Sequence, residues 1–199
     1  MDRYPNPAAK AKVVLHHGVG TNGRQMSLIL GAPLAKRGFE TVALDNLGYG
    51  LTQVRPGSTP SYDDWVDLVV DSLAQEQSRD DRPIVLYGLS AGGMLTYHVA
   101  AKAPRGTLRG IVGMTFLDSY ATYTPAVEPP AFDACPVLLT QPAEDRWTPH
   151  HLSVPVLSRI TKVPVETVML DNAGHYPLEE PGLTQMQDAI ADFVTRNTA

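Results

Sequence analysis

The fold of this chain is decided by residues 83–92, Pro-Ile-Val-Leu-Tyr-Gly-Leu-Ser-Ala-Gly. The first five residues are an apolar run that predicts a buried strand, and the residues after Ser90 predict a helix. Gly-x-Ser-x-Gly between a strand and a helix is typical of a sharp, strained turn that exposes a serine Oγ at the carboxyl end of the strand. Because strand and helix approach closely there, the positions two before and two after the serine must be small. Gly88 and Gly92 meet this requirement, and Gly93 adds room, so Ser90 is the candidate nucleophile.

Five further aliphatic or β-branched runs predict buried strands. They lack the alternation of a half-exposed strand, as expected when helices cover both faces of a parallel sheet. Helical patterns lie between them, and Ser61 with Asp64 resembles a capping box before one of these helices. The predicted class is therefore α/β, with a mostly parallel central sheet of about six strands and helices on both faces. The five runs are 12–16, 40–45, 109–116, 136–141 and 164–170, and the other helical patterns cover 24–37, 91–102, 148–161 and the last segment.

The composition predicts one globular domain spanning 1–199. The net charge is −5 and basic residues are scattered, which argues against nucleic acid as a partner. The single cysteine, Cys135, cannot form an intrachain disulfide, which fits a reducing compartment. The first residues lack the apolar stretch of a signal peptide, and no run approaches the roughly 20 apolar residues of a membrane span. We therefore expect a cytoplasmic protein without stable membrane insertion.

A serine hydroxyl is a weak nucleophile that needs a base, and the base needs an orienting acid. His175 lies just after the last predicted strand, at the edge where a parallel sheet presents its site, so we expect it to be the base rather than an ordinary surface-loop histidine. In the chain order typical of the serine turn, the acid lies between the serine and the histidine. Asp145, just after the strand at 136–141, is the preferred acid. Asp118 is the alternative and Glu144 a weaker one.

The negatively charged oxygen that forms when a serine attacks a carbonyl needs preorganised backbone donors. One is expected to be the N–H of Ala91, directly after the nucleophile. The other is expected from the loop after the strand at 12–16, at the N–H of Val19. His17, in the same loop, is expected to be a buried structural histidine that also borders the substrate pocket.

These stretches together resemble the α/β-hydrolase superfamily, in the branch of carboxylesterases and monoacylglycerol-lipase-like enzymes. Residues 17–20 (His-Gly-Val-Gly) resemble the oxyanion loop, and 45–52 resemble an Asp-x-x-Gly-x-Gly-x-Ser turn with threonine in the serine place. Residues 145–149 and 174–181 resemble the acid and histidine loops. The resemblance implies a serine hydrolase that cleaves small carboxylic esters through an acyl-enzyme, without a cofactor. Thioesters, lactones and carbon–carbon bonds are alternative substrates of the same machinery.

Two departures from the family pattern shape our expectations. The family has two strands before the His-Gly strand, whereas about a dozen residues precede it here. We therefore expect the strand at 40–45 to be an exposed sheet edge, which would allow a homodimer. The family also carries a helical cap, in whose place we expect a short loop at 119–135. An open site with poor discrimination by acyl-chain size would follow. The expected pocket residues are His17, Gly18, Leu89, Tyr120, Tyr123, Trp147 and Tyr176.

Other functions compete for the same residues. Residues 18–23 fit the G-x-G-x-x-G pattern of a dinucleotide-binding turn, with Asp45 as the ribose-binding acid at the end of the next strand. That hypothesis leaves residues 88–92, Asp145 and His175 unexplained. A catalytically inactive scaffold of the same fold is a further alternative. No metal site is predicted, because the adjacent pairs at 16–17 and 150–151 point apart and match no zinc spacing.

Overall fold

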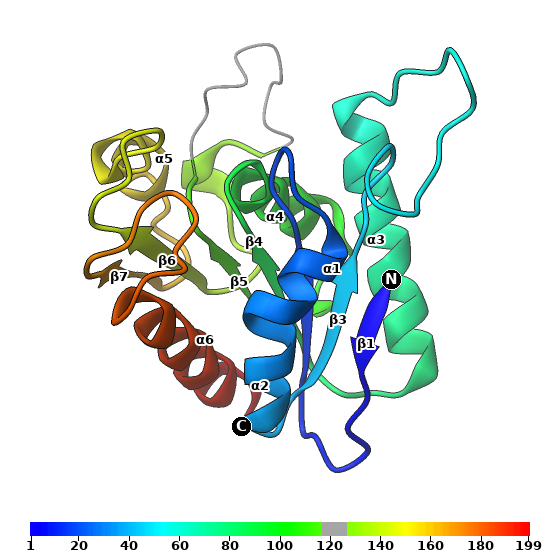
Figure 1. Cartoon of the computed structure of the whole chain (residues 1–199), viewed down its shortest axis with the longest axis horizontal. Helices are drawn as coiled ribbons and strands as arrows, with labels where there is room; N and C mark the ends of the chain where they lie inside the picture. Colours follow the sequence, from blue (N-terminus) through cyan, green and yellow to red (C-terminus); the bar gives the residue numbers. More distant parts are fainter. Residues whose placement is uncertain (117–126) are drawn as a thin grey trace.

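The computed structural model describes residues 1–116 and 127–199. Within these residues, seven strands form one sheet in the order β1-β3-β2-β4-β5-β6-β7 (Figure 1). All neighbouring pairs from β3 to β7 are parallel. The predicted parallel α/β fold is thus confirmed. The strands are β1 (Asp2–Tyr4), β2 (Lys12–His16), β3 (Glu40–Leu44), β4 (Ile84–Gly88), β5 (Leu108–Gly113), β6 (Val137–Pro142) and β7 (Val165–Leu170).

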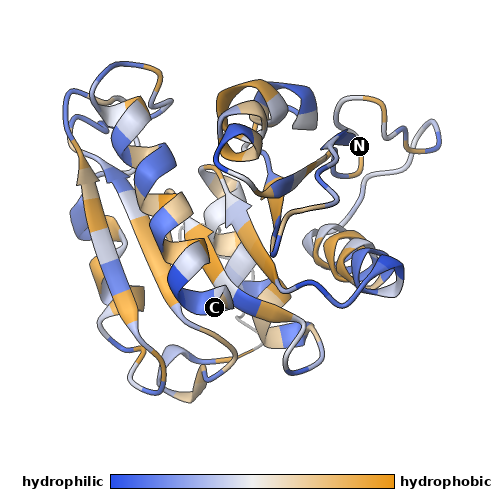
Figure 2. Cartoon of the chain, turned by 90° about the horizontal axis from the view of Figure 1, so that it is seen from below, coloured by the Kyte–Doolittle hydropathy of each residue, from blue (hydrophilic) through white to orange (hydrophobic). Residues whose placement is uncertain are grey.

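Helices cover both faces of the sheet, and each face buries its own apolar layer. The apolar residues of α3, α4 and α5 pack on one face, and those of α1, α2 and α6 pack on the other (Figure 1). Seen from below, apolar strands form the middle layer between the helices (Figure 2). The helices are α1 (Gly23–Met26), α2 (Ala32–Lys36), α3 (Tyr62–Arg79), α4 (Ala91–Lys102), α5 (Val154–Leu157) and α6 (Gly182–Thr198); η1 (Ser27–Gly31) is π-helical, and η2 (Pro129–Ala131) and η3 (His150–Leu152) are single turns.

The prediction that β3 is an exposed edge is wrong. The three residues of β1 pair antiparallel with β3, from Asp2 opposite Ala43 to Tyr4 opposite Thr41. Sequence patterns do not reveal this strand, because Asp-Arg-Tyr is polar and too short to show a period. Its position depends on Arg3, which forms ion pairs with Glu40 of β3 and Glu76 of α3. The sheet edge from which a homodimer was expected is therefore covered.

The helical patterns at 24–37 and 148–161 depart from a single regular α-helix. The first consists of α1, η1 and α2, with the widened π turn directly before Pro33. A proline in a helix cannot donate to the carbonyl four residues earlier and its ring crowds that carbonyl, so the wider turn accommodates it. The second pattern contains only η3 and α5. The capping box is confirmed, because Ser61 Oγ accepts from Asp64 N at 3.1 Å and Asp64 Oδ2 accepts from Ser61 N at 2.8 Å.

A partly buried ion network lies at the amino ends of β2, β3 and β4. Lys12 is 0% exposed, and its Nζ lies 3.0 Å from Asp80 Oδ1 and 2.6 Å from the carbonyl of Glu76. Arg82 binds Glu40 and Asp80 at 2.8 and 2.7 Å. Three cations therefore meet three carboxylates, so the network carries no net charge. Its members are Arg3, Lys12, Glu40, Glu76, Asp80 and Arg82.

The expected loop at 119–135 is described only from Val127 onward, where η2 packs Phe132 against Tyr97 of α4. Asp118, Tyr120 and Tyr123 lie outside the described residues. Of the helices that the structure describes, none is long and apolar enough to cross a membrane.

Candidate active site

Ser90 occupies a strained turn between β4 and α4. Its φ of 53° and ψ of −120° lie outside the ordinary regions for a residue with a side chain, and such backbone costs about 1–3 kcal/mol. Only glycine fits around it. A Cβ at Gly88 would overlap the carbonyl of Gly92, and one at Gly92 would lie 2.7 Å from the carbonyl of His17. A Cβ at Gly93 would overlap the carbonyl of Thr115. The glycines therefore allow the turn that the Gly-x-Ser-x-Gly pattern predicts.

The structure brings Ser90, His175 and Asp145 into one hydrogen-bonded chain. His175 Nε2 lies 2.9 Å from Ser90 Oγ, and His175 Nδ1 lies 2.9 Å from Asp145 Oδ2. An ionised carboxylate only accepts hydrogen bonds, so Nδ1 carries the ring hydrogen. In the neutral ring, Nε2 is then the acceptor for the Ser90 hydroxyl. Three loops at the carboxyl ends of β4, β6 and β7 supply these side chains.

The Asp145 carboxylate is buried and receives several donors. Its Oδ1 accepts from the N–H groups of Trp147 and Thr148, both at 2.8 Å, and its Oδ2 accepts from Thr148 Oγ1 at 2.7 Å. Burial alone would raise the pKa of Asp145, but the hydrogen bonds from Thr148 and His175 outweigh it and lower the pKa below its ordinary value. The carboxylate thus stays ionised next to His175.

Neither alternative acid, Glu144 or Asp118, is seen in contact with His175 among the described residues. Glu144 is exposed, and its backbone N–H binds the carbonyl of Ala173; His175 contacts Asp145 instead. Asp118 lies outside the described residues. Thr148 was not singled out from the sequence, although a threonine three residues after an aspartate in a loop is placed to hydrogen-bond that side chain.

The loop after β2 holds the Gly18–Val19 peptide against the serine turn. The carbonyl of Gly18 accepts from His17 Nδ1 at 2.8 Å, Thr21 Oγ1 at 2.9 Å and Thr21 N at 3.3 Å. Because a trans peptide is planar, with its N–H opposite its carbonyl, the Val19 N–H points away from this cluster of donors. Among the described residues, neither this N–H nor that of Ala91 has a hydrogen-bond partner. A Cβ on Gly18 would lie 3.0 Å from Ser90 Cβ, so the peptide adjoins the serine.

Two buried histidines support this loop from behind. His17 Nε2 accepts from the N–H of Asn46 at 3.1 Å, and His16 Nε2 lies 2.8 Å from Asn46 Nδ2. His16 Nδ1 lies 2.7 Å from the carbonyl of His17. Burial, with a contribution from His17, lowers the pKa of His16 to about 3, and burial also lowers the pKa of His17. Both rings are therefore neutral with hydrogen on Nδ1, and they clamp the ends of β2 and β3 together.

Asp45 is fully engaged in holding its own loop. Its Oδ1 accepts from Gly23 N at 2.7 Å and its Oδ2 from Leu51 N at 3.0 Å. A side chain at Gly50, whose φ is +52°, would overlap the carboxylate. The dinucleotide hypothesis needs this carboxylate to face a ribose, so the geometry gives it no support.

A cavity of about 200 Å³ lies directly beside the Gly18–Val19 peptide and Ala91. We call it the aromatic cavity, because rings of Tyr49, Tyr62 and Trp65 line it. Tyr49 packs on His17 with ring centroids 4.5 Å apart and on Trp65 with centroids 5.7 Å apart. The remaining lining residues are His16, His17, Gly18, Val19, Asn46, Ala91, Gly92 and Leu95.

Of the predicted pocket residues that the structure describes, only His17 and Gly18 line the aromatic cavity. Leu89 is buried in the core below the turn. A helical period in α3 indicates only that Trp65 belongs to an apolar face. Its role as a cavity wall depends on where the loop at 45–52 carries Tyr49. A helical period cannot reveal that meeting.

Trp147 and Tyr176 lie on the other side of the site, beside His175. The Trp147 ring is 5.0 Å from the His175 ring, centroid to centroid, and Trp147 is 71% exposed. The Tyr176 hydroxyl donates to the carbonyl of Val19 at 3.1 Å, which ties the histidine loop to the loop after β2.

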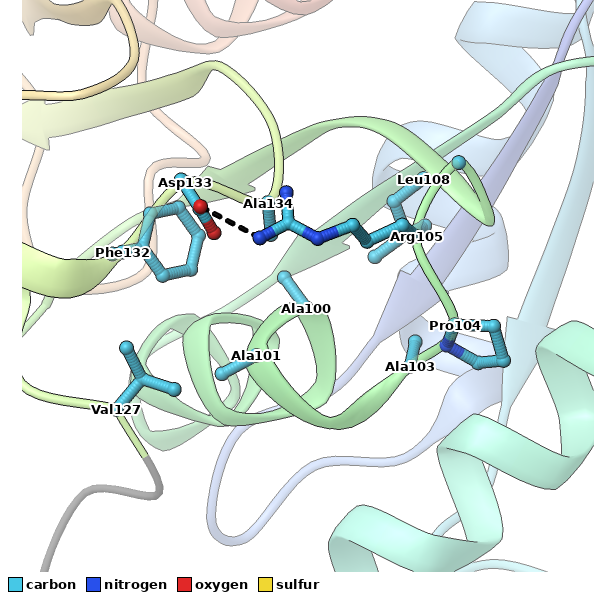
Figure 3. A pocket seen from close by; sticks show the side chains of 11 residues that line it. Ala100, Ala101, Ala103, Pro104, Arg105, Leu108, Val127, Phe132, Asp133 and Ala134 are labelled. Carbon is cyan, nitrogen blue, oxygen red and sulfur yellow. Dashed lines mark hydrogen bonds and ion pairs between the residues drawn. The ribbon is translucent and has the colours of Figure 1, made fainter.

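A second cavity lies far from these residues, at the carboxyl end of α4 (Figure 3). Its volume is about 70 Å³, enough for a few water molecules at most. The ion pair between Arg105 and Asp133, 2.6 Å long, spans it. It holds none of the candidate reactive groups. Among the residues that the structure describes, no cluster of three or more His, Cys, Asp or Glu could hold a metal ion.

The chain is similar to one family of known proteins in sequence and to several solved hydrolases in structure. The family model described as "Serine aminopeptidase, S33" matches residues 7–118. The monoacylglycerol lipase of Paleococcus ferrophilus is similar in structure, with a TM-score of 0.74 and 18% identity over 98% of this chain and 98% of the lipase. Est1E of Butyrivibrio proteoclasticus, solved with ferulic acid bound, has a TM-score of 0.75 and 16% identity over 98% of this chain and 94% of Est1E. A predicted CIB-like hydrolase of Thermoplasma acidophilum has a TM-score of 0.74 and 18% identity over 98% and 90% of the two chains.

Proposed function

Because this chain belongs to the serine aminopeptidase S33 family of α/β hydrolases, we propose that it is a serine hydrolase that cleaves carboxylic esters through an acyl-enzyme. The resemblance to α/β hydrolases that the sequence motifs indicate is confirmed by this match. The observation that carries the proposal is the hydrogen-bonded chain from Ser90 through His175 to Asp145, with two 2.9 Å contacts.

In the proposed acylation step, His175 Nε2 takes the Ser90 proton while Oγ attacks the ester carbonyl carbon. The carbonyl oxygen becomes an oxyanion, which accepts from the N–H groups of Val19 and Ala91. These donors are already oriented, so no reorganisation is needed as the charge develops. The imidazolium then gives its proton to the alkoxide of the leaving alcohol as the ester C–O bond breaks, and an acyl-serine remains.

Deacylation repeats the same steps with water. His175 takes a proton from water, the hydroxide attacks the acyl carbon, and the oxyanion again accepts from Val19 and Ala91. Collapse returns the proton to Ser90 Oγ and releases the acid. Asp145 keeps the ring hydrogen on Nδ1 and stabilises the imidazolium in both halves. Its lowered pKa means that it remains a carboxylate throughout.

An ester substrate fits the site better than a peptide with a free amino terminus. An aminopeptidase needs a carboxylate to bind the substrate ammonium group, since a buried charge must be paired. Among the described residues, neither an aspartate nor a glutamate lines the aromatic cavity. The similarity to a monoacylglycerol lipase agrees with this preference.

Labelling with a fluorophosphonate tests the proposal. Ser90 Oγ would form a bond to phosphorus with loss of fluoride, and we expect one label per molecule. Ser90→Ala should remove the label, whereas Ser78→Ala, which changes an exposed serine of α3, should keep it. Folded protein that takes no label would support the inactive scaffold instead.

A further inference from the structure

The two sides of Ser90 offer different surroundings. On the side of Val19 and Ala91 lies the aromatic cavity of about 200 Å³. On the side of His175 lies an exposed surface formed by the rings of Trp147 and Tyr176, which we call the Trp147 shelf. The cavity is lined from the end of β2, the loops after β2 and β3, and the first turns of α3 and α4. The shelf belongs to the loops after β6 and β7. No residue of the described chain lines the cavity from those two loops.

The positions of the proton donor and of the oxyanion donors determine where the alcohol and acyl halves of an ester lie. His175 Nε2 must reach the leaving oxygen to protonate it, so the alcohol lies next to His175 and therefore next to Trp147. The oxyanion points to the N–H groups of Val19 and Ala91. The remaining substituent of the carbonyl carbon is the acyl group, and it points away from His175 into the aromatic cavity that adjoins those two residues.

The cavity limits the size of the acyl group. An engineered protein cavity of about 150 Å³ holds one benzene molecule, so about 200 Å³ accommodates one six-membered ring or a short branched chain. A long unbranched chain exceeds this volume.

The cavity also limits the polarity of the acyl group. The ring nitrogens of His16 and His17 are already hydrogen-bonded to the backbone and to Asn46. Among the described residues, none with a formal charge lines the cavity. A charged acyl group would be buried without a partner, which is strongly unfavourable.

The shelf sets no comparable limit on the alcohol. Trp147 is 71% exposed, and its ring contacts those of His175 and Tyr176. Flat aromatic groups gain from packing on such a ring beyond the area that they bury.

We infer that the chain selects esters of compact, uncharged apolar acids and accepts bulky aromatic alcohols, with Tyr49, Trp65 and Leu95 as walls for the acid and Trp147 as the support for the alcohol. This inference rests on the proposed function. It differs from the sequence-based expectation of poor discrimination by acyl size, because the walls of the cavity come from segments that the sequence pattern does not bring together.

Two matched ester series test the inference. In the first, p-nitrophenyl acetate, isobutyrate, benzoate, octanoate and palmitate vary only the acid. We expect kcat/KM for isobutyrate and benzoate to exceed that for octanoate by roughly tenfold or more, the scale of discrimination by hydrophobic pockets. In the second series, methyl and 2-naphthyl isobutyrate vary only the alcohol. We expect the naphthyl ester to have the lower KM, and Trp147→Ala to reduce the ratio of naphthyl to methyl kcat/KM by roughly threefold or more.

Trp65→Leu should shift the acyl preference toward octanoate, because it enlarges the cavity. If that variant does not fold, the kcat/KM values of the wild-type protein across the acyl series still test the size limit. Equal kcat/KM for isobutyrate and octanoate, or a naphthyl-to-methyl ratio that Trp147→Ala leaves unchanged, would overturn the inference while acetate turnover upheld the proposed function. Folded wild-type protein that neither hydrolyses the acetate nor takes the fluorophosphonate label would overturn both.

Discussion

The two ends of the sheet differ in the charge of their buried side chains. At the carboxyl end, His16 and His17 are buried and neutral, and the backbone of Ser90 is strained. At the amino end, Lys12 is buried among carboxylates and β1 is held by the Arg3 ion pairs. The carboxyl end keeps reactive groups and free N–H donors in place, and the amino end satisfies its charges internally. The comparison indicates that activity and stability reside largely in different residues, as in other folds whose sites lie at the carboxyl edge.

The largest expected effect is on activity at the carboxyl end. Asp145→Asn should reduce turnover on the order of 10⁴-fold, by analogy with serine proteases, because the ring hydrogen of His175 no longer stays on Nδ1. Steady-state hydrolysis of p-nitrophenyl acetate measures this, and labelling at Ser90 should slow in parallel. Asp118→Asn serves as the matched control. If Asp118→Asn loses the activity and Asp145→Asn keeps it, the acid has been assigned wrongly.

The largest expected effect on stability is at the amino end. Lys12→Met removes the fully buried cation of the network, although Glu76 keeps Arg3 and Asp80 keeps Arg82. Removing one partner of a buried pair costs up to about 3–5 kcal/mol. Denaturant unfolding should show this loss, whereas kcat of the folded protein at moderate temperature should be that of the wild type. A lowered kcat at unchanged stability would break the division between the two ends.

Orientation of the Val19 donor should have an intermediate effect. Thr21→Val removes the hydroxyl that holds the carbonyl of Gly18, while His17 still holds it. We expect kcat to fall roughly tenfold, less than the 10²–10³ for loss of a whole oxyanion donor, with KM little changed. Thr21→Ser keeps the hydroxyl and should restore kcat. If the serine variant is as slow as the valine variant, the hydroxyl does not position the donor.

The smallest expected effect is on the pH dependence of stability, to which the two ends contribute in different pH ranges. His16 and His17 have lowered pKa values in the folded state, so the unfolded chain binds more protons once the pH falls below the ordinary histidine value of about 6.5. Stability should therefore fall by about 1 kcal/mol between about pH 6.5 and 5.5 through His16. The lowered pKa of His17 acts in the same direction.

The carboxylates at the amino end respond in a lower pH range. The hydrogen bond from Arg82 lowers the pKa of Asp80. At Glu40 burial alone would raise the pKa, but the hydrogen bonds from Arg82 and Arg3 outweigh it and lower the pKa. Their contribution is present above the unfolded values near 4 and is lost as the pH falls further. Urea unfolding at several pH values measures both ranges. His16→Asn should flatten only the upper range, and an unaltered slope there would contradict the neutral-histidine account.

Sequence patterns predicted the parts of this molecule that depend on local rules. The serine turn depends on glycines adjacent in the chain, and the bounds of β2 and α4 agree with the predicted 12–16 and 91–102. The contact of His175 with Asp145 could be anticipated because parallel strands place their carboxyl ends together. The position of β1 could not be anticipated, because it depends on the ion pairs of Arg3 with Glu40 and Glu76, which lie far along the chain. The aromatic cavity likewise depends on Tyr49 reaching Trp65, a contact between segments without a shared pattern.

The most direct test is to identify the acylated residue during turnover of p-nitrophenyl acetate. The protein is mixed with the ester, quenched in acid within the first turnover, digested and analysed by mass spectrometry. The account predicts one acetyl group on the peptide that contains Ser90, and its accumulation when deacylation is slow. Hydrolysis with the acetyl group on another residue, or with Ser90 unmodified throughout the first turnover, would contradict it.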